Sequence, residues 1–106
     1  MSTKQIIVLI TVPSKDLGLK IARSLVENQL AACVNLLPAI RSVYRWEGSI
    51  AEDEELLLIA KTKHSLFDQL SELVVQNHPY DVPEVIALPI VAGLREYLTW
   101  INEETI

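Results

Sequence analysis

The sequence is poor in cysteine and glycine, and its apolar runs are short. Cys33 is the one cysteine, so the chain can form neither an internal disulfide nor a cysteine-based zinc cage. The three glycines are scattered singly, which excludes a glycine-rich phosphate-binding loop. The longest apolar runs fall far short of the ~20 residues that span a bilayer. These absences predict a protein that neither crosses a membrane nor holds a nucleotide in a glycine-rich loop.

Basic residues are also scarce. Nine Lys and Arg residues stand against fourteen Asp and Glu residues, which gives a net charge of -5 and a pI near 4.9. Nucleic-acid binders that track phosphates and peripheral proteins that bind anionic lipid both need a basic surface, so both classes are disfavoured. Met1 to Gln5 contain no signal-peptide pattern, and one thiol without a disulfide partner fits a reducing compartment. The expected location is therefore the cytoplasm.

Recognisable catalytic constellations are lacking as well. The sequence has no Gly-x-Ser-x-Gly elbow, and two histidines with one cysteine leave little for metal-assisted hydrolysis. The chain is therefore expected not to be an enzyme. Half of its residues are apolar and the mean hydropathy is +0.27, which is rich for so small a protein. The length predicts one domain over residues 1–106, and the apolar surplus predicts an oligomer interface or a ligand pocket.

Apolar runs and cap signals predict four strands and three helices in the order β-α-β-β-α-β-α. Ser14 and Ser65 are expected to cap the first two helices, and Gly93 to begin a short third one. This is the order of the ferredoxin-like split β-α-β arrangement, an α+β fold with an antiparallel sheet. In that fold the second and fourth strands are the edges of the sheet, where Pro38 and Pro89 can be accommodated. The predicted strands cover residues 6–12, 33–44, 56–62 and 85–91.

The second predicted strand is too long for so small a domain. Its twelve residues would extend about 40 Å, whereas a domain of this size has a radius of gyration of about 13 Å. The hairpin that follows must therefore bend at Pro38 or overhang the core. Tyr44 and Trp46 are residue types that anchor interfaces. We therefore expect a homo-oligomer built through this hairpin, with Tyr44, Trp46 and Glu47 at the interface.

Four polar features each have a functional and an ordinary interpretation. His78, at the end of the second helix, is either a ligand for Cu(II) or Zn(II) or a cap for helix carbonyls. The acidic run at residues 52–55 is either a site for hard cations or a solvated turn. Lys61 and Lys63 either reach a cleft between subunits or end a strand in solvent. Cys33 is either a reactive thiol or a buried structural residue.

Several short motifs occur in the order and spacing of a known family, from about residue 7 to residue 101. The motifs are Leu30-Ala31-Ala32-Cys33-Val34-Asn35, Tyr44-Arg45-Trp46-Glu47-Gly48, Glu52-Asp53-Glu54-Glu55, Lys61-Thr62-Lys63, His78-Pro79-Tyr80-Asp81-Val82-Pro83-Glu84, Ala87-Leu88-Pro89-Ile90 and Tyr97-Leu98-Thr99-Trp100. With this combination the chain resembles the divalent-cation-tolerance protein CutA family. The resemblance implies a homotrimer with the architecture of PII-type signalling proteins, a link to copper tolerance, and binding of divalent metal.

The copper ligands that the resemblance implies are only partly present. Family members credited with a copper site use a cysteine late in the first strand and a pair of histidines just before a Pro-Tyr. Here Ile10, or a neighbour of it, occupies the first position, and the histidine pair reads Asn77-His78. His78 is therefore the expected ligand, and it would need a partner such as Glu84 or a residue of a neighbouring subunit. The chain is expected to bind Cu(II) or another divalent ion weakly.

The resemblance also implies an alternative function. PII-like trimers bind small molecules in clefts between subunits, and Lys61, Lys63 and Glu84 are the residues expected to hold a polar ligand there. In either case the expected partners are further copies of the chain and a metal ion or small ligand, with no nucleic acid and no membrane.

Overall fold

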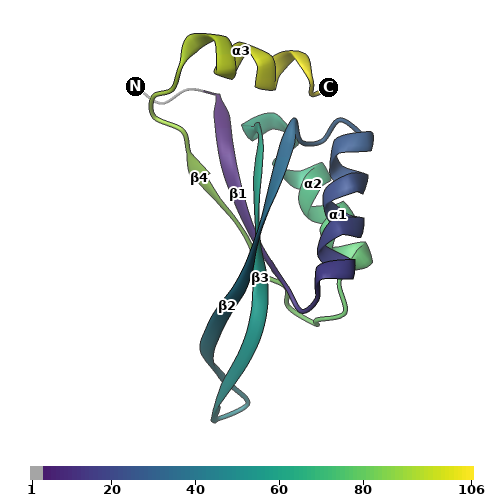
Figure 1. Cartoon of the computed structure of the whole chain (residues 1–106), viewed down its shortest axis with the longest axis vertical. Helices are drawn as coiled ribbons and strands as arrows, with labels where there is room; N and C mark the ends of the chain where they lie inside the picture. The colour runs from purple at the N-terminus through teal and green to yellow at the C-terminus, as the bar shows by residue number, and fades with distance from the viewer. Residues whose placement is uncertain (1–3) are drawn as a thin grey trace.

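The computed structural model describes residues 4–106 and has the predicted order of elements. The elements are β1 Gln5–Val12, α1 Lys15–Glu27, β2 Cys33–Trp46, β3 Ser49–Lys63, a short 3-10 helix η1 His64–Leu66, α2 Phe67–Asn77, β4 Val85–Pro89 and α3 Arg95–Glu103. The four strands form one antiparallel sheet in the order β2-β3-β1-β4, and α1 and α2 lie on one side of it (Figure 1). The predicted α+β class, antiparallel sheet and strand order are confirmed.

The core lies between the sheet and the two helices. Fully buried side chains come from β1 (Ile10), from α1 (Ile21 and Leu25) and from α2 (Leu70 and Val74). Each helix contributes residues spaced by four, so one stripe of each helix is apolar and the opposite face is free for charge. The helices therefore cover the core on one side of the sheet.

The two predicted helix caps have different outcomes. Ser14 does cap α1, because its Oγ accepts a hydrogen bond from the backbone nitrogen of Leu17 at 3.2 Å. The prediction for Ser65 is wrong, because α2 is preceded by η1 and has Leu66 at its N-cap with no side-chain cap. Leu66 is 5 % exposed and packs into the core. The chain enters α2 through the 3-10 turn His64–Leu66, and Ser65 lies inside that turn.

Helix α3 lies across the end of the sheet, near the first residues of β1 (Figure 1). It begins at Arg95, two residues later than the predicted start at Gly93. The buried side chain of Gln5 ties it to β1, since Gln5 Nε2 donates to Asn102 Oδ1 at 2.9 Å and to the carbonyl oxygen of Leu98 at 3.2 Å. Among residues 4–106, no helix is long and apolar enough to cross a membrane.

The hairpin of β2 and β3 extends well beyond the helical layer, at the lower end of Figure 1. It makes the molecule elongated, with principal extents of 44 × 28 × 23 Å. Strand β3 begins at Ser49 and not near Leu56, so the acidic run 52–55 belongs to a strand and its interpretation as a solvated turn is wrong. The turn is a two-residue loop in which Glu47 (φ 50°) and Gly48 (φ 81°) both have positive φ, as a type I′ hairpin turn requires.

A β-bulge bends β2 where Pro38 interrupts it. Leu37 pairs with Leu57, but Ile40 pairs with Glu55, so β2 carries one extra residue at this point. Ala39, next to the proline, has a positive φ of 61°. The predicted long hairpin therefore both bends at Pro38 and overhangs the core. The edge positions predicted for Pro38 and Pro89 are confirmed, because β2 and β4 are the outer strands.

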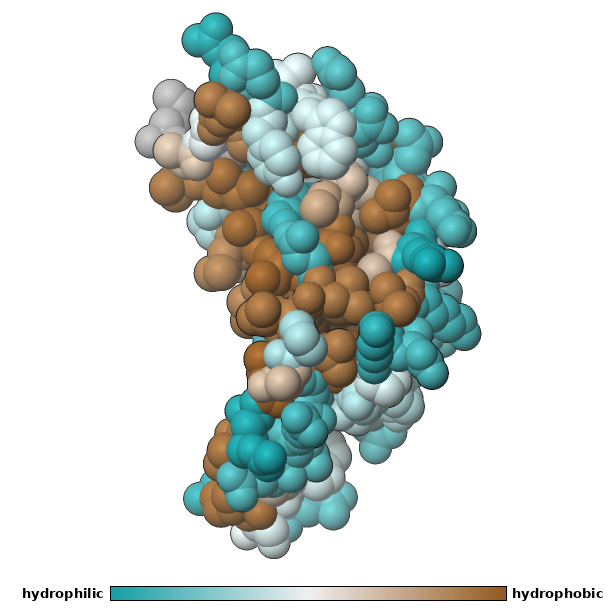
Figure 2. Space-filling view, in the orientation of Figure 1, coloured by the Kyte–Doolittle hydropathy of each residue, from teal (hydrophilic) through white to brown (hydrophobic). Residues whose placement is uncertain are grey.

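The side of the sheet away from α1 and α2, which we call the open face, carries apolar side chains in register. Leu9 lies between Ile59 of β3 and Ile86 of β4, and Ile7 lies opposite Leu88. Ile86 and Leu88 are 51 % and 50 % exposed. Figure 2 shows apolar residues gathered over the middle of the molecule, with polar residues over the helices and much of the hairpin. The structure of one chain thus leaves a broad apolar surface uncovered.

Candidate functional site

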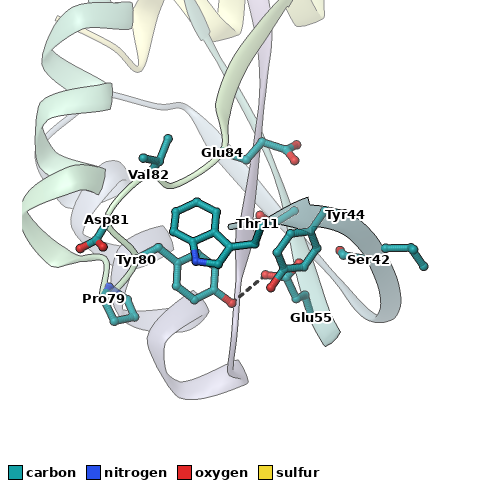
Figure 3. Close-up of a pocket in the computed structure, with 11 residues that line it drawn as sticks. Thr11, Ser42, Tyr44, Glu55, Pro79, Tyr80, Asp81, Val82 and Glu84 are labelled. Atoms are coloured by element: carbon teal, nitrogen blue, oxygen red, sulfur yellow. Dashed lines mark hydrogen bonds between the residues drawn. The ribbon is translucent and has the colours of Figure 1, made fainter. Parts of the chain in front are cut away.

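A pocket of about 660 Å³ lies where the β2–β3 hairpin leaves the body of the molecule (Figure 3). We call it the hairpin pocket. Its walls are the outer part of β2, the segment 79–84, Thr11 near the end of β1 and Glu55 in the middle of β3. Its aromatic and acidic lining residues are Tyr44, Trp46, Tyr80, Glu55, Asp81 and Glu84. Three carboxylates and three aromatic rings therefore share one cavity, and its lining contains no Lys, Arg or His.

Two tyrosine–carboxylate hydrogen bonds organise one wall of the hairpin pocket. Tyr80 Oη donates to Glu55 Oε2 at 2.9 Å, and Figure 3 shows the Tyr80 ring turned toward Glu55 and Tyr44. Tyr44 Oη donates to Asp53 Oδ2. Glu55 is only 5 % exposed, although it belongs to an acidic run; it pairs with Ile40 beside the bulge and accepts a hydrogen bond from Tyr80 of the segment 79–84. A buried carboxylate thus faces the pocket with a phenol as its hydrogen-bond donor.

Both phenols stay protonated well into the alkaline range. Burial, followed by the hydrogen bond to Glu55, raises the pKa of Tyr80 above its usual value near 10. The hydrogen bond to Asp53 is the first cause that raises the pKa of Tyr44, and burial adds to it. Losing either proton would place a phenolate beside a carboxylate, which like-charge repulsion opposes. Tyr44 and Tyr80 therefore act as neutral hydrogen-bond donors in this site.

His78 lies beneath the hairpin pocket and is 9 % exposed. Its Nδ1 accepts a hydrogen bond from the backbone nitrogen of Tyr80 at 3.2 Å, so Nε2 carries the ring proton and donates it to the carbonyl oxygen of Thr11 at 2.8 Å. The ring also packs against Tyr80, with centroids 4.6 Å apart. His78 therefore holds the segment after α2 against β1, and both of its ring nitrogens are engaged.

The predicted copper ligands, His78 and Glu84, have different surroundings in the structure. Ile10 is fully buried in the core, and Asn77 Nδ2 donates to the carbonyl oxygen of Leu73 at 2.8 Å. Glu84 is exposed and lines the hairpin pocket, whereas the ring nitrogens of His78 are occupied within the fold. Across residues 4–106 no group of three or more His, Cys, Asp or Glu residues is placed to hold a metal ion. Within the described residues of one chain, His78 and Glu84 therefore have no third ligating residue beside them.

The predicted cleft lysines lie elsewhere on the molecule. Lys61 and Lys63 alternate along β3 with buried Thr62, so they project from the open face, where both are half-buried. Lys63 Nζ is 3.5 Å from the carbonyl oxygen of Thr105 beyond α3. Lys61 of β3 pairs with Ile7 of β1. Strand β4, which begins directly after Glu84, starts opposite Ile10 of β1. Ile7 and Ile10 are about 10 Å apart along β1. One chain therefore does not bring the lysines together with Glu84.

The predicted interface residues are accessible in the single chain. Tyr44 and Trp46 are 40 % and 46 % exposed, and Glu47 is exposed at the turn. Cys33 is half-buried at the start of β2, opposite Lys61. Burial is the first cause that raises the pKa of Tyr97, and the neighbouring Cys33 adds to it. Tyr44 and Trp46 thus serve both the hairpin and the hairpin pocket.

Comparisons with known proteins agree on one family. A family model described as CutA1 divalent ion tolerance protein matches residues 6–104. A divalent-cation tolerance protein CutA of Thermus thermophilus is 54 % identical over 99 residues, which cover 93 % of this chain and 96 % of that protein. A solved structure described as a divalent cation tolerance protein (Cut A1) from the same organism has a TM-score of 0.95 and 53 % identity, covering 96 % of this chain and 99 % of that chain.

A plant relative differs in length. The chloroplastic CutA protein of Arabidopsis thaliana is 54 % identical over 100 residues, which cover 94 % of this chain but 55 % of that protein. This chain thus spans about half the length of the plant relative. The names of the family model and of the two Thermus thermophilus matches describe tolerance of divalent cations and no chemical reaction.

Proposed function

The chain belongs to the CutA1 divalent ion tolerance family, and from that premise we propose that it serves divalent cation tolerance as a cytoplasmic homotrimer without enzymatic activity. The role in tolerance follows from the family. Each subunit is one domain over residues 1–106. The observation that carries the assembly is the uncovered apolar surface of the open face, which continues toward the overhanging hairpin.

The exposed surface supports assembly on physical grounds. Ile86 and Leu88 are about half exposed in the single chain, and Leu37 beside the bulge is 49 % exposed. Soluble monomers rarely leave such contiguous apolar areas in water, because each buried Å² contributes about 25 cal/mol. Tyr44 and Trp46, with Glu47 at the turn, then add anchors along the hairpin.

Light scattering coupled to size-exclusion chromatography tests the assembly. The expected result is a single species with three times the chain mass of 11.9 kDa. A species of the chain mass alone at micromolar concentration would overturn the homotrimer.

Copper binding by His78 and Glu84 stays a prediction, and the proposal routes no step through it. His78 would first have to give up a hydrogen bond to Thr11 or to the backbone of Tyr80. A calorimetric Cu(II) titration decides it, with His78→Ala compared against His64→Ala, because His64 is exposed on η1. Affinity lost only in His78→Ala would support the ligand role. Equal Cu(II) affinity in both variants would mean that copper is coordinated only nonspecifically at the surface.

A second candidate function is a small-molecule sensor. Lys61 and Lys63 favour it, because they project from the open face, where a neighbouring subunit would lie in the proposed trimer. Two lysines there suit an anionic ligand. A thermal-shift panel of nucleotides and small acids tests this role, since a ligand at a hundred times its dissociation constant stabilises a protein by about 2.7 kcal/mol. If no compound of the panel raised the thermal midpoint, the sensor function would be overturned and cation tolerance would remain as the proposed function.

A further inference from the structure

We propose that the hairpin pocket is a binding site for an organic ammonium cation. This inference goes beyond cation tolerance, and it places the ligand beside the subunit interface, because Tyr44 and Trp46 belong both to the pocket lining and to the interface that we propose. The pocket volume of about 660 Å³ lies within the range of sites that hold small organic molecules, about 300–1,000 Å³. The pocket borders the hairpin surface that we assign to the interface, so its ligand is tested on the assembled protein.

The charge of the lining selects a cation. Glu55, Asp81 and Glu84 face the pocket without any basic residue in its lining. Glu55 is 5 % exposed, and the structure gives it one hydrogen bond within residues 4–106, from a neutral phenol. A buried carboxylate without a positive partner is unfavourable, because burial removes the water that stabilised its charge. A bound cation would supply the missing partner.

The aromatic lining selects an organic cation over a bare ion. Tyr44, Trp46 and Tyr80 line the pocket and are 40 %, 46 % and 37 % exposed in the single chain, where Tyr44 and Trp46 are also residues of the proposed subunit interface. Ring faces attract ammonium groups through their negative quadrupole, and tryptophan does so most strongly. Apolar substituents of the ligand would at the same time cover aromatic surface that the neighbouring subunit leaves in water. Neither gain is available to a hydrated metal ion.

The separation of the carboxylates excludes a metal cage. Figure 3 shows Asp81 and Glu84 on different sides of the Tyr80 ring, with Glu55 in a third position. No group of three acidic, His or Cys residues within 4–106 converges on one point. A hard cation such as Ca²⁺ needs six to eight oxygen ligands at one centre. Carboxylates spread around a cavity suit an extended molecule with a charged end.

The test compares benzylammonium with benzyl alcohol, which differ in charge and are alike in shape. Each is titrated into the ¹⁵N-labelled assembled protein, and amide and indole resonances are followed by NMR. We expect benzylammonium to shift the indole resonance of Trp46 and the amides of residues 80–84. We expect the alcohol to bind about tenfold more weakly, since it lacks the cation–π attraction and the ion pair. Equal binding of the two, or shifts located elsewhere, would overturn the proposal.

A matched pair of variants assigns the charge. Glu55→Gln removes the carboxylate charge but keeps an amide oxygen that can accept from Tyr80. Glu54→Gln removes the same charge from the next residue of β3, which is exposed and points to the opposite side of the strand. Benzylammonium should bind about tenfold more weakly to Glu55→Gln and unchanged to Glu54→Gln. Equal weakening in both would show that net charge alone attracts the probe.

A second variant tests the same binding site if the Glu55→Gln protein does not fold. Glu84→Gln changes an exposed residue of the pocket, so it leaves the core untouched. It should also weaken benzylammonium binding severalfold and leave benzyl alcohol unaffected. Binding of benzylammonium that is unchanged in Glu84→Gln and in Glu55→Gln would overturn the site. Light scattering measures separately whether a variant remains trimeric, and dissociation of the trimer tests the proposed assembly and not the ammonium site.

Discussion

At the scale of single residues, His78 shows how environment decides the role of an imidazole. In the sequence it stands before Pro79 and Tyr80 and is a candidate metal ligand. In the structure its two ring nitrogens link the backbone of Tyr80 to the carbonyl oxygen of Thr11. Residues 11 and 78 are brought together only by the fold, so no spacing in the sequence reveals this contact. His78 thereby fixes the segment that forms one wall of the hairpin pocket.

His78→Ala should lower the free energy of unfolding by about 1–3 kcal/mol, because the buried carbonyl of Thr11 loses its donor. Urea unfolding at a fixed chain concentration measures the change. The control is His64→Ala, which removes an exposed imidazole and should change stability by less than about 0.5 kcal/mol. A His78→Ala protein as stable as the control would contradict the structural role.

Tyr80 should make the protein sensitive to alkali. Its pKa is raised by burial and by Glu55, so the folded state holds the phenolic proton more tightly than the unfolded chain. Stability is therefore complete below about pH 10, where both states are protonated, and declines at higher pH as only the unfolded chain ionises. Tyr80→Phe should lose less stability than the parent protein between about pH 9 and about pH 11, measured by urea unfolding. Equal losses would contradict this linkage.

At the scale of elements, the β2–β3 hairpin shows what local patterns can and cannot predict. The length of β2 and its break at Pro38 correctly predict an overhanging, bent hairpin. The pattern places the start of β3 too late, because residues 52–55 are acidic and acidic residues are uncommon in strands. Pairing with β2 overrides that preference, since each of these residues has a ladder partner from Ile40 to Val43. Local propensity yields to the register of the partner strand.

The hairpin pocket could be predicted only in part for a related reason. Tyr44 and Trp46 are recognisable as residues with a role, because large aromatic side chains next to a turn are candidates for contact. Glu55 is hidden in an acidic run, and its partner Tyr80 lies 25 residues away. The one local sign is that Glu55 directly precedes the apolar run that begins at Leu56. Its contact with Tyr80 of the segment 79–84 is made by the fold, so no local pattern encodes it.

Two substitutions in the hairpin turn should change stability in opposite directions. Gly48 has a φ of 81°, so Gly48→Ala should lower the free energy of unfolding by about 1 kcal/mol. Glu47 has a φ of 50°, a conformation that asparagine adopts more readily, so Glu47→Asn should raise it by a few tenths of a kcal/mol. Thermal unfolding of both variants beside the parent protein measures the two effects. Shifts of the same sign would contradict the type I′ turn.

At the scale of the whole molecule, the fold closes one side of the sheet and leaves the other open. The helices bury Ile10, Leu58 and their neighbours, whereas Ile86 and Leu88 on the open face stay half exposed. The composition already signals this imbalance, because half of the residues are apolar in a chain of 106. Composition cannot locate the surplus, since its position depends on strand register. A surface that only assembly covers should make folding and assembly interdependent.

Leu88→Lys should therefore dissociate the protein, whereas Val75→Lys should not. Both positions are exposed in the single chain, at 50 % and 55 %, but Leu88 lies on the open face and Val75 on α2. Because assembly stabilises only the folded state, the thermal midpoint of the parent and of Val75→Lys should rise with concentration. The midpoint of Leu88→Lys should be lower and independent of concentration, and light scattering should give the mass of one chain. A Leu88→Lys protein that keeps the parent's mass and concentration dependence would mean that the subunits meet through another surface.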